Sequence, residues 1–243
     1  MKKNTIYIIA LLVSALSNNL FAQQLTTTGA MNTMDKTGFA PQIWLDTINN
    51  KSHLYALEPY EKLQGEITIV DGKPFFVTAY IEGKSKIGQS WDIKSPFFVS
   101  ANVTNWKAFE LTDDISSVSD IQTIVADIAK ANGYDTNTPF PFKLEGLLEQ
   151  ATFHIVTPRS NDITGYRENV NQQLFPFDNI KGQIIGFYSE NHQGIFTGSK
   201  SFIHVHFLKN DQTFMGHLDK IKTSKSNLTL YLPSKSTSST IRE

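Results

Sequence analysis

Apolar and polar residues alternate over several short stretches of the chain, as they do in β-strands with one buried face. The clearest stretches are residues 66–70 and 73–80, which flank Asp71-Gly72. Because Asp-Gly readily supplies the positive φ angles of a type I′ turn, these two stretches predict a β-hairpin. Further strands are expected at residues 97–103, 152–157, 182–188 and 228–232.

One segment instead has the spacing of an amphipathic helix, from about Ser119 to Ala131. Its apolar residues recur every three or four positions and fall on one face. These residues are Ile121, Ile124, Val125 and Ile128. Ser119 or Asp120 can cap its first turn, and Asn132-Gly133 predicts its end.

Three of the six histidines lie close together in the sequence, at His204, His206 and His217. Residues two apart on a strand point to the same face, so His204 and His206 should share one space. A two-residue turn at Asn210-Asp211 would place His217 directly opposite His204 on the next strand. Gly216 would let another backbone or a ligand approach closely.

Three imidazoles with an open fourth position are typical of catalytic zinc, whereas structural zinc is usually enclosed by four ligands rich in cysteine. The chain has no cysteine. These three histidines are therefore expected to bind Zn²⁺. The strand and helix patterns together predict an α+β fold of mixed and antiparallel β-sheets with few helices, and we expect the histidine hairpin to form the floor of a cleft. Imidazoles also bind copper, nickel and iron, and each histidine alone could be an ordinary hydrogen-bonded strand residue.

The N-terminus has the pattern of a secretory signal peptide, expected over residues 1–22. Lys2 and Lys3 precede the apolar run Ile6–Leu16, and the small residue Ala22 marks the expected cleavage point. The run is shorter than the ~20 apolar residues of a membrane span. We expect a periplasmic or extracellular protein with no membrane span in its mature form.

The rest of the chain, residues 23–243, is expected to form one domain of two sheet-rich halves, about 40–140 and 141–232. Phenylalanine is abundant, with 17 residues, which fits a sheet-rich fold. The formal net charge is only −1. Without a basic stripe, nucleic acid is not an expected partner; a homodimer remains possible.

Taken in order, several short motifs resemble those of the α-acetolactate decarboxylase family over most of residues 45–222. They are Leu63–Gly72, like its L-D-G-E-hydrophobic-D-G hairpin; Ser95-Pro-Phe97, like T-P-F; Phe142–Gly146 and Phe153–Ser160, like I-x-G-x-F and T-R-S; Gly182–Phe187, like G-T-L-V-G-F; and Ile203–Phe207 with Gly216-His217, like H-x-H-F followed by G-H. Glu58-Pro59-Tyr60 stands where the family typically has Gly-Thr-Phe, which is expected to alter a wall of the pocket.

The resemblance implies decarboxylation of 2-acetolactate, a small 2-hydroxy-3-oxo acid, to acetoin and CO₂ by a carboxy-lyase of acetoin biosynthesis. It also implies roles for six residues: His204, His206 and His217 as zinc ligands, Glu66 as the acid/base beside the metal, Arg159 as the cation facing the substrate carboxylate, and Glu243 as the C-terminal glutamate that relatives return to the metal.

Two other functions fit the three histidines. One is an exported zinc hydratase or hydrolase, in which the open position holds a water molecule whose pKa falls to about 7. The other is a non-catalytic binding protein of the same fold. Acetoin formation from acetolactate distinguishes the decarboxylase from both.

Overall fold

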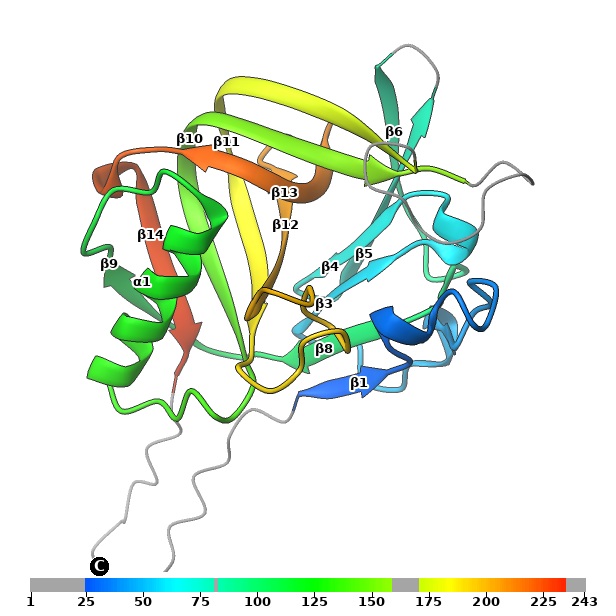
Figure 1. Ribbon diagram of the computed structural model, residues 1–243, viewed down its shortest axis with the longest axis horizontal. Helices are drawn as coiled ribbons and strands as arrows, with labels where there is room; N and C mark the ends of the chain where they lie inside the picture. The colour runs from blue at the N-terminus through cyan, green and yellow to red at the C-terminus, as the bar shows by residue number, and fades with distance from the viewer. Residues whose placement is uncertain (1–24, 81–82, 159–170, 235–243) are drawn as a thin grey trace, which may run out of the picture.

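Two six-stranded antiparallel sheets and a single α-helix make up most of the computed structural model, which describes residues 25–80, 83–158 and 171–234 (Figure 1). The predicted α+β class is confirmed. All pairings between named strands in these residues are antiparallel. No helix of the described residues is long and apolar enough to cross a membrane.

The first sheet is built from the N-terminal part of the chain and has the strand order β1-β8-β3-β4-β5-β6. Its strands are β1 (Thr26–Thr28), β3 (Leu54–Pro59), β4 (Glu66–Val70), β5 (Lys73–Tyr80), β6 (Lys84–Gln89) and β8 (Phe98–Asn102). A small pair, β2 (Ile43–Trp44) and β7 (Lys94–Ser95), is separate from it. Three short 3₁₀-helices lie in this part of the chain: η1 (Met31–Thr33), η2 (Leu45–Thr47) and η3 (Glu61–Leu63).

The second sheet is built from the C-terminal part and has the order β11-β12-β13-β10-β14-β9. Its strands are β9 (Trp106–Glu110), β10 (Phe140–Val156), β11 (Gln172–Tyr188), β12 (Ile203–Lys209), β13 (Met215–Lys222) and β14 (Leu228–Pro233), with η4 (Lys225–Asn227) before the last. Because β10 also pairs with β11, the four strands β10 to β13 form a closed ring. A closed ring hides the backbone groups that open sheet edges expose.

The hairpin predicted at Asp71-Gly72 is confirmed. β4 ends at Val70 and β5 begins at Lys73, which are paired in register. Asp71 and Gly72 have φ angles of 48° and 74°, the left-handed conformation that a type I′ turn requires at both central residues. This hairpin fixes the position of Glu66 at the start of β4.

The predicted helix is present as α1 (Val118–Ala131) and packs its apolar face into the main core. Its cap differs from the prediction: Ser117, not Ser119 or Asp120, accepts a hydrogen bond from the backbone N–H of Asp120. An N-cap residue stands before the first turn and bonds to an N–H of that turn, so the helix begins one residue earlier than the apolar pattern indicated.

The histidine hairpin has a different register from the predicted one. His217 is directly opposite His206 rather than His204. The connection is longer than two residues: the N–H of Lys209 bonds to the carbonyl of Phe214, and Gln212 takes a positive φ of 58°. The longer turn shifts the pairing by two residues. A shift of two leaves every side chain on its predicted face, so the histidines still converge.

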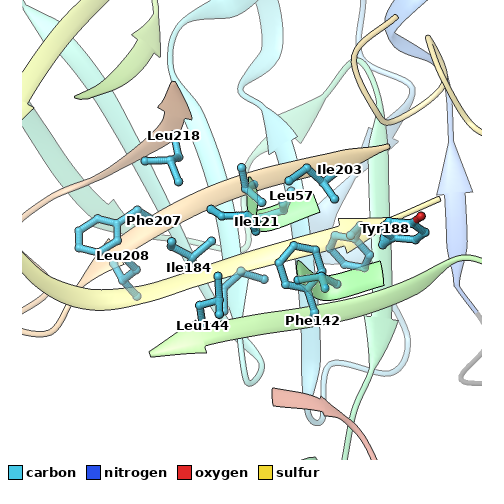
Figure 2. Packing of buried hydrophobic residues seen from close by; sticks show 14 of the residues in the cluster. Leu57, Ile121, Phe142, Leu144, Ile184, Tyr188, Ile203, Phe207, Leu208 and Leu218 are labelled. Carbon is cyan, nitrogen blue, oxygen red and sulfur yellow. The ribbon is translucent and has the colours of Figure 1, made fainter. Parts of the chain in front are cut away.

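A large apolar core joins the second sheet, α1 and one face of the first sheet. Figure 2 shows its packing around Leu57, Ile121, Phe142 and Phe207, which come from β3, α1, β10 and β12. The other face of the first sheet has a smaller apolar cluster of its own. Its buried members are Leu45, Leu54, Ala56, Ile67, Ile69, Ile93 and Phe98. The two faces of the first sheet therefore contact different surroundings.

Candidate active site

The three predicted histidines converge on the side of β12 and β13 that faces the first sheet. The ring centroids of His204 and His206 are 4.9 Å apart. The ring centroid of His217 lies 5.3 Å from that of His204 and 5.5 Å from that of His206. His206 is completely buried and His204 is 4 % exposed. The face predicted from strand periodicity is therefore correct for all three.

These spacings fit three ligands of one metal ion. With Zn–N bonds of ~2.0–2.1 Å, an imidazole centroid lies roughly 3.2 Å from the metal, and tetrahedral bond angles then separate two centroids by about 5 Å. The three observed separations are close to that value. The rings are thus spaced as ligands of one ion are, but among the described residues it is the donor atoms of His154, His217 and Asp219 that all lie within 4.8 Å of one another, so His204 and His206 would have to turn their rings to share an ion with His217.

The hydrogen bonds leave one nitrogen of each ring for such a role. Among the described residues, His204 Nδ1, His206 Nε2 and His217 Nδ1 are buried without a hydrogen-bond partner. The other nitrogen of His206, Nδ1, is 2.9 Å from the hydroxyl of Thr68. Buried polar atoms normally have partners, so these three nitrogens are available to bind a metal ion.

The protonation states also suit metal binding. Burial is the main cause that lowers the pKa values of His204 and His206 well below the ordinary range, and the neighbouring imidazoles lower them further. Burial and the charge of His154 lower the pKa of His217. Imidazole must be neutral to donate its lone pair to a metal. The environment therefore keeps the three rings in the form that binds.

Glu66 lies beside these rings, on β4 of the first sheet. Its Oε2 is 3.8 Å from His206 Nε2, and its Oε1 accepts a hydrogen bond of 3.1 Å from the backbone N–H of Val156. Burial raises the pKa of Glu66 to about 7, although the positive charge of His154 and the Val156 hydrogen bond act in the opposite direction. A carboxyl group with this pKa can both donate and accept a proton near neutral pH.

Two further residues of the site, His154 and Asp219, were not predicted from the sequence. His154 on β10 is directly opposite His217, and the two rings stack 4.5 Å apart. Asp219 Oδ1 is 2.7 Å from His154 Nδ1 and 3.6 Å from His217 Nδ1. The second distance is too long for a hydrogen bond but brings the charge of Asp219 close to the ring. Donor atoms of His154, His217 and Asp219 all lie within 4.8 Å of one another, so this group could also hold a metal ion.

The glycines at 65 and 216 serve backbone packing. A Cβ at Gly65 would collide with the carbonyl oxygen of Val77, and one at Gly216 would lie 2.9 Å from that of His154. Of the two alternatives predicted for Gly216, the close approach of another backbone or of a ligand, the structure shows the approach of a backbone. These contacts bring β5 close to the start of β4, and β10 close to the histidine hairpin.

Two residues assigned by resemblance, Arg159 and Glu243, lie outside the described residues, and their roles stay predictions. Thr68 and Asp219 had a signal in the sequence, since each follows a site residue by two positions, and β-strand periodicity places it on the same face. His154 had no such signal, because only the pairing of β10 with β13 brings it to the site.

Comparison with known proteins gives a family match over most of the chain. The model of the family described as alpha-acetolactate decarboxylase matches residues 57–238. The alpha-acetolactate decarboxylase of Brevibacillus brevis is 26% identical over 137 residues, which is 56% of this chain and 46% of that protein. The chain thus aligns with about half the length of this curated relative. The family resemblance predicted from the motifs is confirmed.

Solved structures agree on the fold. The crystal structure of alpha-acetolactate decarboxylase from Bacillus subtilis strain 168 superposes with a TM-score of 0.66 at 18% identity, covering 86% of this chain and 85% of that one. A Staphylococcus aureus protein of unknown function, described as similar to alpha-acetolactate decarboxylase, gives 0.65 at 16% identity, with 87% and 85% covered. At these identities the likeness shows a shared fold.

Proposed function

We propose, from the premise that this chain belongs to the alpha-acetolactate decarboxylase family, that it decarboxylates 2-acetolactate to acetoin and CO₂ with a zinc ion. One observation carries the proposal: three neighbouring imidazoles, two of them buried and each with a buried nitrogen that has no hydrogen-bond partner among the described residues, stand beside the buried carboxyl group of Glu66. Neutral imidazoles and an absence of cysteine favour zinc in an open, catalytic site.

The substrate itself makes the reaction feasible. Acetolactate is a β-keto acid, so loss of CO₂ leaves an electron pair that delocalises onto the neighbouring ketone oxygen. An organic cofactor that accepts electrons is therefore unnecessary. A zinc ion held by His204, His206 and His217 would supply a positive charge, as a Lewis acid, against the negative charge that develops on this oxygen.

Glu66 would then complete the reaction by proton transfer. Decarboxylation of the acetolactate anion leaves an enolate, and one proton added to its carbon gives acetoin. Because burial raises the pKa of Glu66 to about 7, the carboxyl group is protonated often enough at neutral pH to donate that proton, and the resulting carboxylate regains one from solvent. Glu66 approaches from the first sheet, so a proton from it would reach one face of the carbon only, which favours a chiral product.

Arg159 is proposed, by resemblance alone, to hold the carboxylate that leaves as CO₂. Its planar guanidinium can bind a carboxylate through two parallel hydrogen bonds. We also propose, from Lys2, Lys3 and the apolar run Ile6–Leu16, that the protein is exported. The mass of the protein recovered from a cell's exported fraction should correspond to a chain that begins after Ala22.

The decisive experiment is to incubate the purified, zinc-loaded protein with 2-acetolactate and measure acetoin. We expect acetoin formation, about one divalent metal ion per chain by elemental analysis, and loss of activity after chelation that zinc restores. Absence of acetoin from zinc-loaded protein would reject the decarboxylase and favour a zinc hydrolase, a hydratase or a binding protein.

A further inference from the structure

A second histidine–carboxylate pair borders the three imidazoles. His154 is 9 % exposed, and its Nδ1 lies 2.7 Å from Asp219 Oδ1. At this distance the Asp219 carboxylate accepts a hydrogen bond from Nδ1 of His154. The other ring nitrogen, Nε2, is directed elsewhere.

The strand register explains how this pair arises. His206, His217 and His154 are paired across β12, β13 and β10, so the three rings form one row across three strands. The register of β10 with β13 shifts at the next step, where Phe153 pairs with Leu218 and Thr152 with Lys220. Asp219 is thus the extra residue of a β-bulge. Bulges are common next to active sites because they redirect a side chain.

The nitrogen of His154 that Asp219 does not bind faces Glu66. His154 Nε2 is 3.8 Å from Glu66 Oε1, the same oxygen that accepts the hydrogen bond from Val156 N–H. The other oxygen, Oε2, faces His206 Nε2 at 3.8 Å. The two oxygens of Glu66 therefore have different surroundings: Oε1 lies against β10, and Oε2 lies against the three imidazoles.

We propose that His154, held by Asp219, is a positioning residue that orients the carboxyl group of Glu66, so that Oε1 stays against β10 and Oε2 is presented to the substrate. This inference rests on the proposed function, because it gives Glu66 its acid/base role. A carboxyl group buried on a strand can rotate about its last bond, and terminal torsions of this kind are broad. One backbone hydrogen bond alone leaves that rotation less restricted than two contacts on the same oxygen do.

The test is His154→Phe, which keeps a flat ring against His217 but has no nitrogen to face Glu66. We expect kcat to fall about 10- to 100-fold, the usual cost of losing a residue that orients a functional group. KM should change by less than about 3-fold, since the substrate-binding groups are untouched. His154→Gln, whose amide nitrogen can approach the place of Nε2, should recover most of the lost turnover.

The molecule offers a matched control. His53 Nδ1 lies 2.8 Å from Asp71 Oδ1, the same pairing as His154 with Asp219, but the two side chains are 47% and 56% exposed, and the pair adjoins the β4–β5 turn, at the far end of β4 from Glu66. His53→Phe removes an equivalent pair away from the imidazoles and should leave kcat and KM unchanged.

Cobalt substitution distinguishes positioning from metal binding. If His154 acts through Glu66, the visible spectrum of the Co²⁺-loaded protein should be the same in wild type and His154→Phe, and both should bind one ion. A changed spectrum or a lost ion would make His154 a metal ligand and overturn the proposal. So would unchanged kcat in a correctly folded His154→Phe.

A readout that does not need turnover separates this inference from the proposed function. In protein labelled with ¹³C at glutamate carboxyl groups, the signal of Glu66 is the one missing from Glu66→Gln. That signal should move in His154→Phe and stay in place in His53→Phe. If zinc-loaded wild type makes no acetoin but the signal moves as expected, the proposed function fails while the contact of His154 with Glu66 stands; an unmoved signal rejects the contact itself.

Discussion

Glu58 and Glu66 are two buried glutamates on neighbouring strands of the first sheet, and they differ in the face to which they point and in the groups around their carboxyl oxygens. Glu58 is completely buried and Glu66 is 3 % exposed. In the register of β3 with β4, Glu58 pairs with Ile67 and Pro59 pairs with Glu66. Neighbouring residues of a strand point to opposite faces, so the two carboxyl groups point to opposite sides of the sheet.

Their surroundings explain two different chemical outcomes. Glu66 accepts a hydrogen bond from Val156 and faces His154 and His206, and these influences limit the pKa increase that burial causes to about 7. Both oxygens of Glu58 are buried, and neither has a hydrogen-bond partner in the part of the chain that the structure describes. Burial raises the pKa of Glu58 well above its ordinary value, and no opposing charge limits the increase.

The comparison teaches that burial alone does not make a catalytic carboxyl group. Strand periodicity places Glu58 on the face of Ala56 and Ile67, within the small apolar cluster, away from the histidines. Glu58-Pro59-Tyr60 was expected to alter a wall of the pocket; in the structure Glu58 faces away from the histidines. Of these three residues, Pro59 can still alter the wall of the pocket, because it is paired with Glu66.

The largest expected effect is the loss of Glu66 as an acid. Glu66→Gln keeps the size of the side chain and one acceptor oxygen for Val156, but it has no proton of suitable pKa. Turnover should fall ~10²–10⁴-fold, as is typical when acid/base catalysis is lost. Steady-state assays of acetoin formation measure this change.

Glu58→Gln is the matched control for that substitution, because it makes the same change on the other face of the sheet. Its turnover should equal that of the wild type within error. Equal losses in both variants would mean that the faces do not differ in function, and full activity of Glu66→Gln would remove Glu66 from the mechanism.

A smaller effect is expected from Thr68, which also points to the histidine face. Thr68→Val removes the hydroxyl that lies 2.9 Å from His206 Nδ1 and keeps the shape of the side chain. Hydrogen bonds to metal-binding imidazoles typically contribute 10- to 100-fold to metal affinity or activity, so zinc affinity should fall by about that factor. Competition with a chelator of known affinity measures it.

The control for Thr68 is Ser100→Ala, which removes a buried hydroxyl from β8. Ser100 pairs with Ala56 and so belongs to the opposite face. Zinc affinity of this variant should match that of the wild type. If it falls as far as in Thr68→Val, the loss reflects general destabilisation and not the orientation of His206.

Elements defined by neighbouring residues could be predicted from the sequence. The Asp71-Gly72 hairpin and α1 depend on local turn and capping chemistry and were predicted nearly in full. The shared face of His204, His206 and His217 was also predictable, because period-2 alternation survives an error of two residues in register.

Features that depend on distant partners could not be predicted. β10 and β11 are each 17 residues long, whereas the sequence predicted only their ends at 152–157 and 182–188. Gly146 and Gly182 are paired with each other inside the β10–β11 hairpin. The backbone of Asn227 occupies the space where a Cβ of Gly146 would be. Likewise, only the pairing of β10 with β13 reveals that His154 belongs to the site.

The smallest expected effect is on stability: it is the pH dependence that Glu58 alone gives to the free energy of unfolding. In the unfolded chain its pKa is about 4.3, and in the folded protein burial raises it well above that value. Between these two values the unfolded state is ionised while the folded state holds a proton. The unfolded state then binds fewer protons, so the free energy of unfolding must fall as pH rises, by about 1.4 kcal/mol per pH unit.

Two variants divide this cost into its parts, with urea unfolding of zinc-free protein measured across neutral and alkaline pH in a Glu66→Gln background, because Glu66 itself titrates at about pH 7. Glu58→Gln should abolish the fall with pH, since an amide does not ionise, but it keeps a buried polar group without a partner. Glu58→Leu should abolish the fall and also raise the free energy of unfolding by about 1–3 kcal/mol relative to Glu58→Gln, the cost of such a group. A wild-type slope that persists in Glu58→Leu would show that another residue titrates, and the contrast between the two faces would then rest on Glu66 and Thr68 alone.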